Sequence, residues 1–430
     1  MNQHVHLAIS EIPVSSIVFR EDLYPRIETS AVTVQKYADD LSVLPPVEVN
    51  QRNELIDGWH RWTAHKKNEV ATIRIVVTET ASDAELLELA IERNASHGLQ
   101  LTQQDKQDMA RRIYNATPER DRDEKKKHLA KILAVSERTV RDWLSRIDKD
   151  TKAARDRKIF DMWLACYTNE EIAEAVQITH QAVSLVLQEA AGLPKLAKSE
   201  QATASHASDF EPMFYNIWKQ QTKTKGSDHF GNSEVRWLDN LLYSYTKPFD
   251  IIIDPFAGGG STIDLCRKRF RRYLVSDRKP VVEREKEIRA HDLTEGLLKP
   301  PNWKDVALVY LDPPYWKQAE GEYSKDDADL ANMDLATFNT TLAGVINGYA
   351  KKLTAGHIAL IISPTQWRAP DHQFTDHIGD MLRLVKLPVD MRISAPYESQ
   401  QYPAQMVEWA KENRRYLVLT REIVVWKVGD

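Results

Sequence analysis

The stretch FDIIIDPFAGGGSTIDLC, residues 249–266, decides the fold. It begins with an apolar run that ends at Asp254, continues through three glycines and passes into a helix-forming sequence. A strand, a glycine turn and a helix in this order are typical of a parallel sheet covered by helices. Glycines let the backbone approach a ligand closely, and the next helix begins with free N–H groups. We therefore expect a ligand site at this turn.

Two common nucleotide ligands fit the turn poorly. A nucleoside triphosphate loop has the pattern GxxxxGK[ST], and no lysine follows Gly260 here. A dinucleotide loop has the pattern GxGxxG; Gly258 and Gly260 match it, but Ile263 stands at the third glycine. The ligand of this turn must therefore be inferred from the motifs that follow it.

Further apolar runs follow the turn, separated by helix-like sequences. They are RRYLVSD (271–277), ALVYLDPP (307–314) and GHIALIIS (356–363). This alternation predicts a multidomain α/β chain whose C-terminal part is a parallel sheet wrapped by helices. Prolines end a strand, so Asp312 is expected at a strand tip. A carboxylate, rigid carbonyls and aromatic rings at that tip suit a flat polar ligand.

DPFAGGGST (254–262), RRYLVSD and LDPPYW (311–316) resemble, in this order, the DNA amino-methyltransferases. The resemblance implies a Rossmann-like sheet with helices on both faces and S-adenosylmethionine as cofactor. Asp277 ends a strand, where its carboxylate can accept hydrogen bonds from both ribose hydroxyls. The resemblance places Asp292 at the adenine amino group of the cofactor. The predicted cofactor-binding residues are Asp254, Pro255, Phe256, Ala257, Gly258, Gly260, Asp277 and Asp292.

The DPPY residues explain how an amino group could be methylated. The exocyclic nitrogen of adenine is a poor nucleophile because the ring shares its lone pair. Asp312 and the Pro313 carbonyl can accept its two N–H bonds and draw the lone pair towards the methyl donor. Tyr315 can stack on a base rotated out of the duplex. The predicted catalytic residues are Asp312, Pro313, Pro314 and Tyr315.

The resemblance favours adenine as the target, because this family tends to carry DPPY for adenine and SPPY for cytosine. The cytosine amino group stays open, since the same loop geometry serves both. The chain departs from the family in having no sizeable target-recognition insertion. Residues 316–333, WKQAEGEYSKDDADLANM, predict an acidic mobile loop. Sequence selection is then expected elsewhere in the chain.

Two segments resemble helix-turn-helix units, KHLAKILAVSERTVRDWLSRI (127–147) and NEEIAEAVQITHQAVSLVLQEA (169–190). Residues 101–160 hold 17 Lys or Arg against 11 Asp or Glu, which is compatible with a phosphate-binding face. The alternative is small helical packing without DNA contact. The predicted DNA-contacting positions are Arg138, Thr139, Arg141, His180, Gln181 and Ser184.

The first hundred residues resemble a small α+β ParB-like N-terminal domain. The resemblance rests on LYPR, VQKYADDL, PPVEV, ELIDGWHRWTAHKK and ERNASHGLQLT. Chromosome-partition members carry a nucleotide-binding box, GERRxRA, of which Gly58, Arg61 and Ala64 remain here. The differences argue against nucleotide binding. Arg61 and His60 stay as candidate phosphate contacts, and the alternative is a buried tryptophan with flanking salt bridges.

Composition limits the class of protein. Of 430 residues, 42% are hydrophobic and 28% charged, with a net charge of −5, and there is no signal-peptide pattern or long apolar run. We therefore expect a cytoplasmic protein without a membrane segment. Two cysteines, Cys166 and Cys266, and thirteen histidines without ligand spacing predict no metal.

Composition also divides the chain into five segments. We predict a ParB-like domain (1–100), two helix-turn-helix regions (101–150 and 151–192), a linker (193–209) and a methyltransferase domain (210–430).

These patterns predict a site-specific DNA methyltransferase that acts on adenine N6 and binds DNA. The alternatives are a DNA N4-cytosine methyltransferase, a ParB-like DNA-binding regulator with an inactive methyltransferase half, or a methyltransferase for RNA or protein. The assembly resembles those of phages and mobile elements, where it could modify DNA or mark it against restriction. The sequence leaves a homodimer open.

Overall fold

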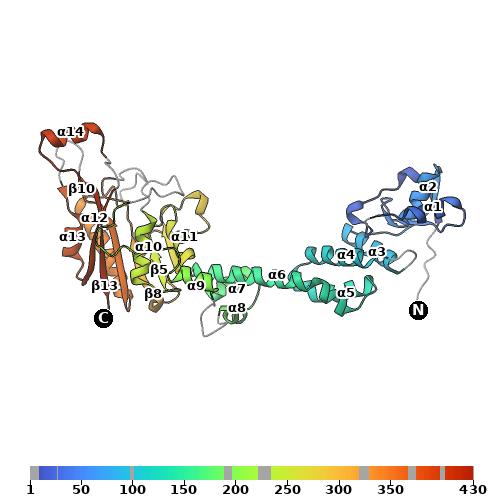
Figure 1. The fold of residues 1–430 in the computed structure, drawn as a ribbon, viewed down its shortest axis with the longest axis horizontal. Coiled ribbons are helices and arrows are strands. Elements are labelled where there is room, and N and C mark those ends of the chain that lie inside the picture. The colour runs from blue at the N-terminus through green and yellow to red at the C-terminus, as the bar shows by residue number, and fades with distance from the viewer. Residues whose placement is uncertain are drawn as a thin grey trace. The chain divides into compact units, whose positions relative to one another are not determined.

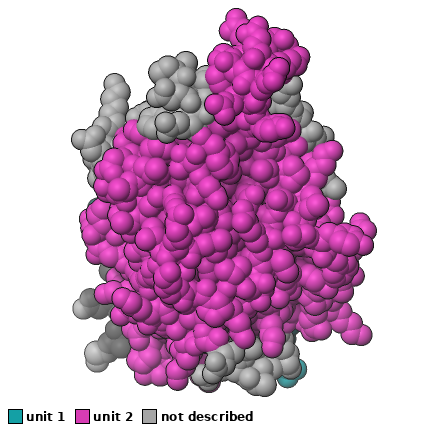
Figure 2. Space-filling model, turned by 90° about the vertical axis from the view of Figure 1, so that its left-hand side faces the viewer, with its two compact units in different colours: residues 1–154 teal, residues 155–430 magenta. Residues whose placement is uncertain are grey.

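The computed structural model describes residues 9–26, 28–96, 101–187, 196–220, 234–318, 329–366, 374–397 and 402–429. It forms two compact units, residues 1–154 and 155–430, which have separate colours in Figure 2. Parts of the predicted linker, of the predicted mobile loop and of the second helix-turn-helix region lie outside the described residues. Each unit has its own sheet or helical core, so the predicted multidomain α/β class is confirmed.

The first unit begins with a four-stranded sheet in the order β1-β4-β2-β3. Its helices and strands are β1 (Ile9–Pro13), α1 (Ala31–Asp39), β2 (Val47–Val49), β3 (Leu55–Asp57), α2 (Trp59–Lys67), β4 (Thr72–Val77) and α3 (Asp83–Ser96). Only β2 and β4 pair in parallel among the described strands of this sheet. The buried side chains of these elements form a small core of their own.

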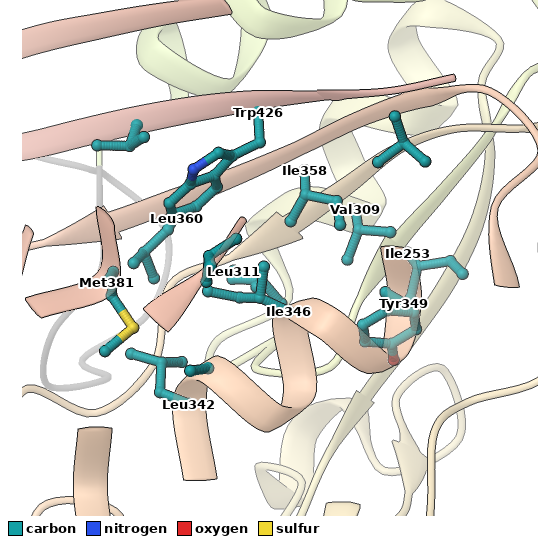
Figure 3. Packing of buried hydrophobic residues seen from close by; sticks show 14 of the residues in the cluster. Ile253, Val309, Leu311, Leu342, Ile346, Tyr349, Ile358, Leu360, Met381 and Trp426 are labelled. Atoms are coloured by element: carbon teal, nitrogen blue, oxygen red, sulfur yellow. The ribbon is translucent and has the colours of Figure 1, made fainter. Parts of the chain in front are cut away.

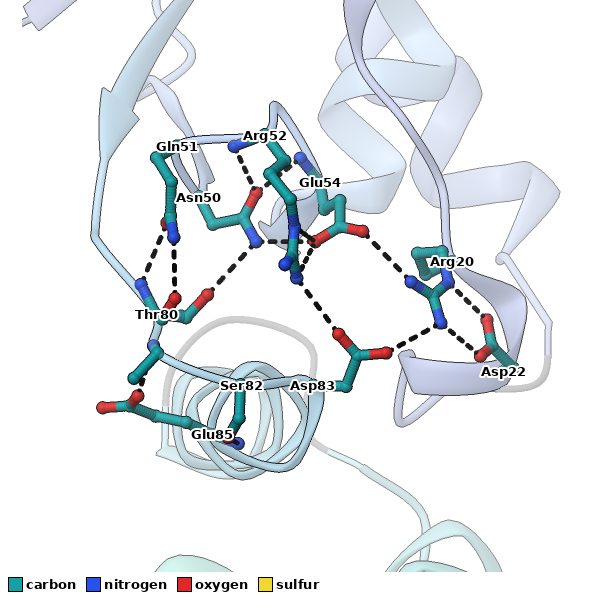
Figure 4. A network of polar contacts seen from close by, with 11 residues as sticks. Arg20, Asp22, Asn50, Gln51, Arg52, Glu54, Thr80, Ser82, Asp83 and Glu85 are labelled. Carbon is teal, nitrogen blue, oxygen red and sulfur yellow. Dashed lines mark hydrogen bonds and ion pairs between the residues drawn. The ribbon is translucent and has the colours of Figure 1, made fainter.

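A polar network holds the β2–β3 hairpin against the start of α3 (Figure 4). Glu54 accepts hydrogen bonds from Asn50 at 2.6 Å and from Arg20 at 3.1 Å. Arg20 and Arg52 both reach Asp83, the first residue of α3, at 3.1 Å. Because each charge has a partner of opposite sign, this cluster is explained by structure alone.

Three helices follow the small sheet in the first unit: α4 (Gln103–Ala116), α5 (Arg122–Ile132) and the beginning of α6 (Glu137–Leu164). Buried apolar residues of all three share one core. The turn between α5 and α6 passes through Ala134 with φ +50°, and Ser136 then caps α6. α6 is continuous across the boundary predicted at residue 150, because no glycine or proline interrupts it.

The second helix pair belongs to the second unit. α7 (Asn169–Val176) and α8 (His180–Leu187) pack on the end of α6 through Ile159, Ile172 and Val183. Leu164, the last residue of α6, lies in a core cluster with residues of the large sheet. The predicted second helix-turn-helix unit is therefore linked to that sheet through the end of α6.

The large sheet has seven strands in the order β12-β13-β9-β8-β5-β6-β7. Figure 1 labels β5, β8 and β13 of this sheet. β5 to β9 run parallel, and β13 is antiparallel to both its neighbours. The chain order reverses between β5 and β8, which makes that gap the switch point of the sheet. The strands are β5 (Ile251–Asp254), β6 (Arg272–Asp277), β7 (Arg289–Ala290), β8 (Val306–Leu311), β9 (Gly356–Ile362), β12 (Val389–Pro396) and β13 (Thr420–Val428).

Helices cover both faces of this sheet, as predicted. Successive strand residues point to opposite faces, so each face has its own apolar cluster. Figure 3 shows one of them, where α12 (Leu335–Lys352) and α13 (His377–Leu384) meet Ile253, Val309, Leu360 and Trp426. α10 (Val235–Tyr245) and α11 (Ser261–Arg269) cover the other face. The remaining described elements of the unit are α9 (Lys198–Ala204), β10 (Thr365–Gln366), β11 (Phe374–Thr375) and α14 (Ala404–Glu412). No helix of the described residues is long and apolar enough to cross a membrane.

The segment that we predict as a linker contains α9, which is docked by buried arginines. Arg269 is fully buried and binds Asp239 at 2.7 Å and Asp209 at 2.6 Å. It also donates to a carbonyl in the last turn of α9, and Arg271 donates to another. Residues 198–209 are therefore packed against α10 and α11. Their polar composition hides this, because the docking groups are arginines distant in sequence.

Replacement of Arg269 by methionine should strongly destabilise the second unit. It leaves the buried carboxylate of Asp239 without its main partner, a loss of about 3–5 kcal/mol in the free energy of unfolding. Arg157→Met is the matched control, because the Arg157–Asp161 pair is exposed; it should change stability by less than about 1 kcal/mol. Calorimetric unfolding of both variants measures this, and equal losses would contradict the role given to Arg269.

Candidate active site

Three neighbouring strands of the large sheet end in carboxylates. Asp254 is the last residue of β5, Asp277 is the last of β6, and Asp312 follows the end of β8. β5 pairs in parallel with both β6 and β8, so all three side chains lie at the carboxyl edge of the sheet. This edge includes the switch point between β5 and β8, where sheets of this kind bind their ligands.

Asp254 holds the glycine turn from inside. Its side chain is buried and accepts hydrogen bonds from the Phe256 amide at 2.9 Å and the Thr262 hydroxyl at 2.6 Å. Burial raises the pKa of the Asp254 carboxyl to about 7, and the charges of Asp312 and Asp277 add to the rise against those hydrogen bonds. The carboxyl group thus supports the turn and does not face solvent.

The glycine turn needs its glycines for backbone reasons. Gly258 has φ +49° and Gly260 has φ +79°, and residues other than glycine rarely adopt these backbone angles. The amide of Gly258 donates to Asp277 Oδ2 at 3.0 Å, which links the turn to the end of β6. Arg284 donates to the Gly260 carbonyl at 3.0 Å and pairs with Asp264 in α11. The turn is therefore fixed at both ends before any ligand binds.

The other predicted cofactor residues are also at this edge. Pro255 and Ala257 are buried within the turn, and Phe256 is half-buried against the core that contains α12. Asp292 lies two residues beyond β7, and its Oδ2 pairs with Arg278 Nε at 2.8 Å. Its Oδ1 accepts from the amide and hydroxyl of Thr294, and those hydrogen bonds hold the pKa of Asp292 below its usual value.

The DPPY residues form a short loop after β8. Pro313 is buried, and the Tyr315 hydroxyl donates to Asp312 Oδ1 at 3.1 Å. Trp316 is buried, and its Nε1 donates to the Met333 carbonyl at 2.8 Å. The structure thus assigns Trp316 to the core and leaves Tyr315 as the partly exposed ring.

Arg421, near the start of β13, was missed by sequence reasoning. Its guanidinium lies 5.4 Å from the Tyr315 ring centre and 5.3 Å from that of Tyr397, whose hydroxyl accepts from Nε at 3.0 Å. Burial opposes the charge, yet these tyrosines and Asp312 hold the pKa of Arg421 above its usual value. A permanent cation therefore packs on the Tyr315 ring. No sequence signal indicates it, because the two residues are far apart in the chain.

A second support of the DPPY loop was also missed. The Thr365 hydroxyl donates to the Trp316 carbonyl at 3.0 Å and lies 2.8 Å from His377 Nε2. His377 is fully buried between the rings of Trp316 and Phe338, and burial lowers its pKa to about 4. The neutral imidazole therefore fixes Thr365, and Thr365 fixes the loop.

The predicted DNA-contacting positions of the first helix-turn-helix unit lie in the first turns of α6. Arg138 is exposed. Arg141 is exposed and pairs with Glu137 at 3.4 Å. The Thr139 amide donates to Ser136 Oγ, so Thr139 takes part in the helix cap. The two arginines are the residues of this set that point into solvent with a charge.

In the predicted second helix-turn-helix unit, His180 and Gln181 are exposed at the start of α8. Ser184 is half-buried and accepts from Asn169 of α7 at 3.0 Å, so it serves helix packing. In the first unit Arg61 pairs with Asp57 at 2.7 Å.

His60 is buried and accepts a hydrogen bond from the Ser30 amide, and burial lowers its pKa. The alternative of a structural role therefore fits His60, whereas Arg61 stays a prediction.

The pH dependence of stability should report the buried carboxyl of Asp254. Its pKa in the fold is about 7 against an ordinary value of 3.8, so the folded chain keeps a proton that the unfolded chain has lost. Stability should therefore fall as pH rises from about 4 to about 7. Asp254→Asn, which keeps an acceptor oxygen and stays neutral, should gain thermal stability relative to wild type between about pH 5 and pH 8. A melting difference that is constant with pH would contradict this.

Comparison with solved structures gives weak overall likenesses. A pNOB8-like ParB N-domain is 15% identical, with a TM-score of 0.28 over 42% of this chain and 93% of its own. The C-terminally truncated chromosome-partitioning protein ParB of Caulobacter crescentus, in complex with the centromeric parS site, is 16% identical, with a TM-score of 0.24 over 43% of this chain and 87% of its own. The comparison with curated proteins found no match.

A family match covers the part of the chain that carries the glycine turn. The N6/N4 family described as DNA methylase matches residues 103–285. This span includes Asp254, Gly258, Gly260 and Asp277 and ends before Asp312. Over this span, which is less than half of the chain, the sequence is thus similar to the N6/N4 DNA methylase family.

Proposed function

We propose that this protein transfers a methyl group from S-adenosylmethionine to the exocyclic N6 amino group of adenine in DNA. The observation that carries the proposal is the placement of the glycine turn and of Asp312 at the ends of the adjacent parallel strands β5 and β8. A cofactor bound at the turn and a base bound at Asp312 would meet at the switch point of the sheet. The DNA methylase match supports the same reaction class.

The residues at this edge fit S-adenosylmethionine by their chemistry. The cofactor would supply an electrophilic methyl group on its sulfonium. The glycine turn offers backbone without side chains and the start of α11, and Asp277 offers carboxylate oxygens to ribose hydroxyls. The Oδ2 atom of Asp292 would bind the amino group of the cofactor's adenine only if Arg278 released that oxygen. We propose the full set of predicted cofactor residues as this binding site.

On the substrate side, Asp312 and the Pro313 carbonyl would accept the two N–H bonds of the target amino group. These acceptors stabilise the positive charge that grows on nitrogen as it is methylated. The Tyr315 hydroxyl donates to Asp312 Oδ1 and so keeps the carboxylate oriented. Arg421 packs on the Tyr315 ring and would hold it in place for stacking on a flipped base.

DNA would be held by the two helix-turn-helix units as well as by the sheet. Arg138 and Arg141 are the proposed phosphate or base contacts of the first helix-turn-helix unit. His180 and Gln181 are the proposed contacts of the second helix-turn-helix unit. The second pair is packed in the same compact unit as the catalytic edge, which suits a fixed spacing between bound DNA and the target base. Arg61 is a further proposed phosphate contact.

The nature of the base is the finer part of the proposal. Adenine is favoured because DPPY in this family tends to accompany adenine, and N4 of cytosine is the second candidate. The third candidate is a DNA-binding regulator with an inactive methyltransferase half. The glycine turn, with Asp254, Asp277 and Asp312 at one edge of the sheet, argues against this candidate.

Transfer of label from S-adenosylmethionine to unmethylated genomic DNA tests the proposal. Wild type should give 6-methyladenine, identified by mass spectrometry of the nucleosides. Asp312→Ala should lower the rate at least about 100-fold because it removes an acceptor of the reacting amino group, and Asp312→Asn should keep part of the activity. Cofactor binding should remain in both variants.

Other outcomes discriminate the alternatives. Label in 4-methylcytosine would keep the mechanism and change the base. Label in neither base, with the cofactor bound, would contradict a DNA substrate. Absence of cofactor binding in wild type would favour the regulator.

A further inference from the structure

A short arm of the second unit, residues 402–419, stands at the same edge of the sheet as the candidate active site. It joins β12 to β13, and Pro396 at the end of β12 pairs with Thr420 at the start of β13. Glu422 in turn pairs with Ile362, the last residue of the parallel strand β9. The arm therefore leaves and re-enters the sheet at its carboxyl edge. In Figure 1 the helix of the arm, α14, lies beyond β10. In Figure 2, which is turned about the vertical axis, part of the second compact unit projects at the same height.

The tip of the arm is basic and aromatic. Arg414 and Arg415 are exposed, and neither has an ion-pair partner among the described residues. Tyr416 follows them with 94% of its surface exposed, and Lys411 is exposed with a neighbouring carboxylate at 2.7 Å. Unpaired cations beside an exposed ring are the side chains that bind phosphates and stack on bases.

The tip is held in shape by backbone and side-chain hydrogen bonds. Arg414 has φ +53°, and the amide of Arg415 donates to the Ala410 carbonyl at 2.8 Å, which ends α14. Gln366 of β10 donates to the Tyr416 carbonyl at 2.6 Å and accepts from the Val418 amide at 2.9 Å. The two arginines and the tyrosine are thus presented by a fixed turn.

The same strand, β10, also holds the DPPY loop. Thr365, beside Gln366, donates to the carbonyl of Trp316, the residue after DPPY. One two-residue strand therefore binds the arm with one side chain and the catalytic loop with the other. A ligand that contacts the arm is consequently held at a defined position relative to Asp312.

We propose that this arm is a DNA contact of the methyltransferase unit itself. Arg414 and Arg415 bind backbone phosphates, and Tyr416 stacks against an exposed base or sugar near the target. The proposal rests on the proposed function and adds a DNA contact at the same edge of the sheet as Asp312. It is separate from the helix-turn-helix contacts, which lie on α6 and α8.

The test compares two pairs of neighbouring cations in the full-length protein. Arg414→Ala/Arg415→Ala removes the arm pair, and Lys351→Ala/Lys352→Ala removes an exposed pair at the end of α12, which precedes β9 at the opposite edge. Binding of a fluorescent DNA duplex is measured over a range of salt concentrations. Loss of two phosphate contacts should make the negative slope of log K against log salt shallower by about 1.8 in the arm variant. The slope of the control variant should equal that of wild type.

Methyl transfer provides the second measurement. Tyr416→Ala should keep the salt slope, the melting temperature and the cofactor affinity and lower kcat/KM for DNA about 10-fold through lost stacking. If wild type methylates DNA and the arm variant has the slope and kcat/KM of the control, the arm proposal is overturned and the proposed function stands. Equal slope losses in both cation pairs would also overturn it. If wild type does not methylate DNA, the proposed function fails, and the salt slopes still decide whether the arm binds DNA.

Discussion

The parallel pairing of β5 with β8 is the constraint on which the candidate site depends. Ile253 pairs with Val309, so Asp312 lies only two residues beyond the level of Asp254 although 58 positions separate the two in the chain. The strand that leads into the glycine turn and the strand that leads into DPPY are therefore neighbours at one edge. β6 on the far side of β5 adds Asp277, which lies two residues beyond Val275, the partner of Asp254. The chemistry proposed for this protein needs this convergence, which the two clusters on the sheet faces stabilise.

Three carboxyl groups at one edge repel each other, and the structure relieves this in different ways. Asp254 is buried, and its raised pKa keeps it partly protonated around neutral pH. Asp277 takes an amide hydrogen bond from the glycine turn. Asp312 takes the hydroxyl of Tyr315 and lies in the field of Arg421. At this edge one carboxyl group therefore serves the fold, and the other two are the ones that we propose as ligand contacts.

Much of this arrangement could be predicted from the chain alone. The apolar run, glycine turn and helix around Asp254 predicted a parallel sheet with helices on both faces, and the prolines after Asp312 predicted a strand end. Local patterns carry this information because strand, turn and helix are each specified by neighbouring residues. The helix-turn-helix spacing similarly predicted α5 to α8.

The long-range contacts could not be predicted in the same way. Arg421 reaches Tyr315, and Thr365 reaches the DPPY loop, only because β13 and β10 return to the carboxyl edge. The docking of α9 by Arg269 depends likewise on tertiary packing, and a polar segment that looked like a linker is a packed helix. A single sequence shows which residues are charged, and it does not show which distant partner they meet.

The most direct test of the account is the binding of S-adenosylhomocysteine to the full-length protein by titration calorimetry. In the proposed site the ribose hydroxyls lie at Asp277 and the target amino group lies at Asp312. Asp277→Asn should therefore weaken binding about 10-fold, the effect of losing charged hydrogen bonds, with little change in melting temperature. Asp312→Ala should bind nearly as wild type does. Undiminished binding by Asp277→Asn, or equal losses in both variants, would contradict the division of this edge into a cofactor half and a substrate half.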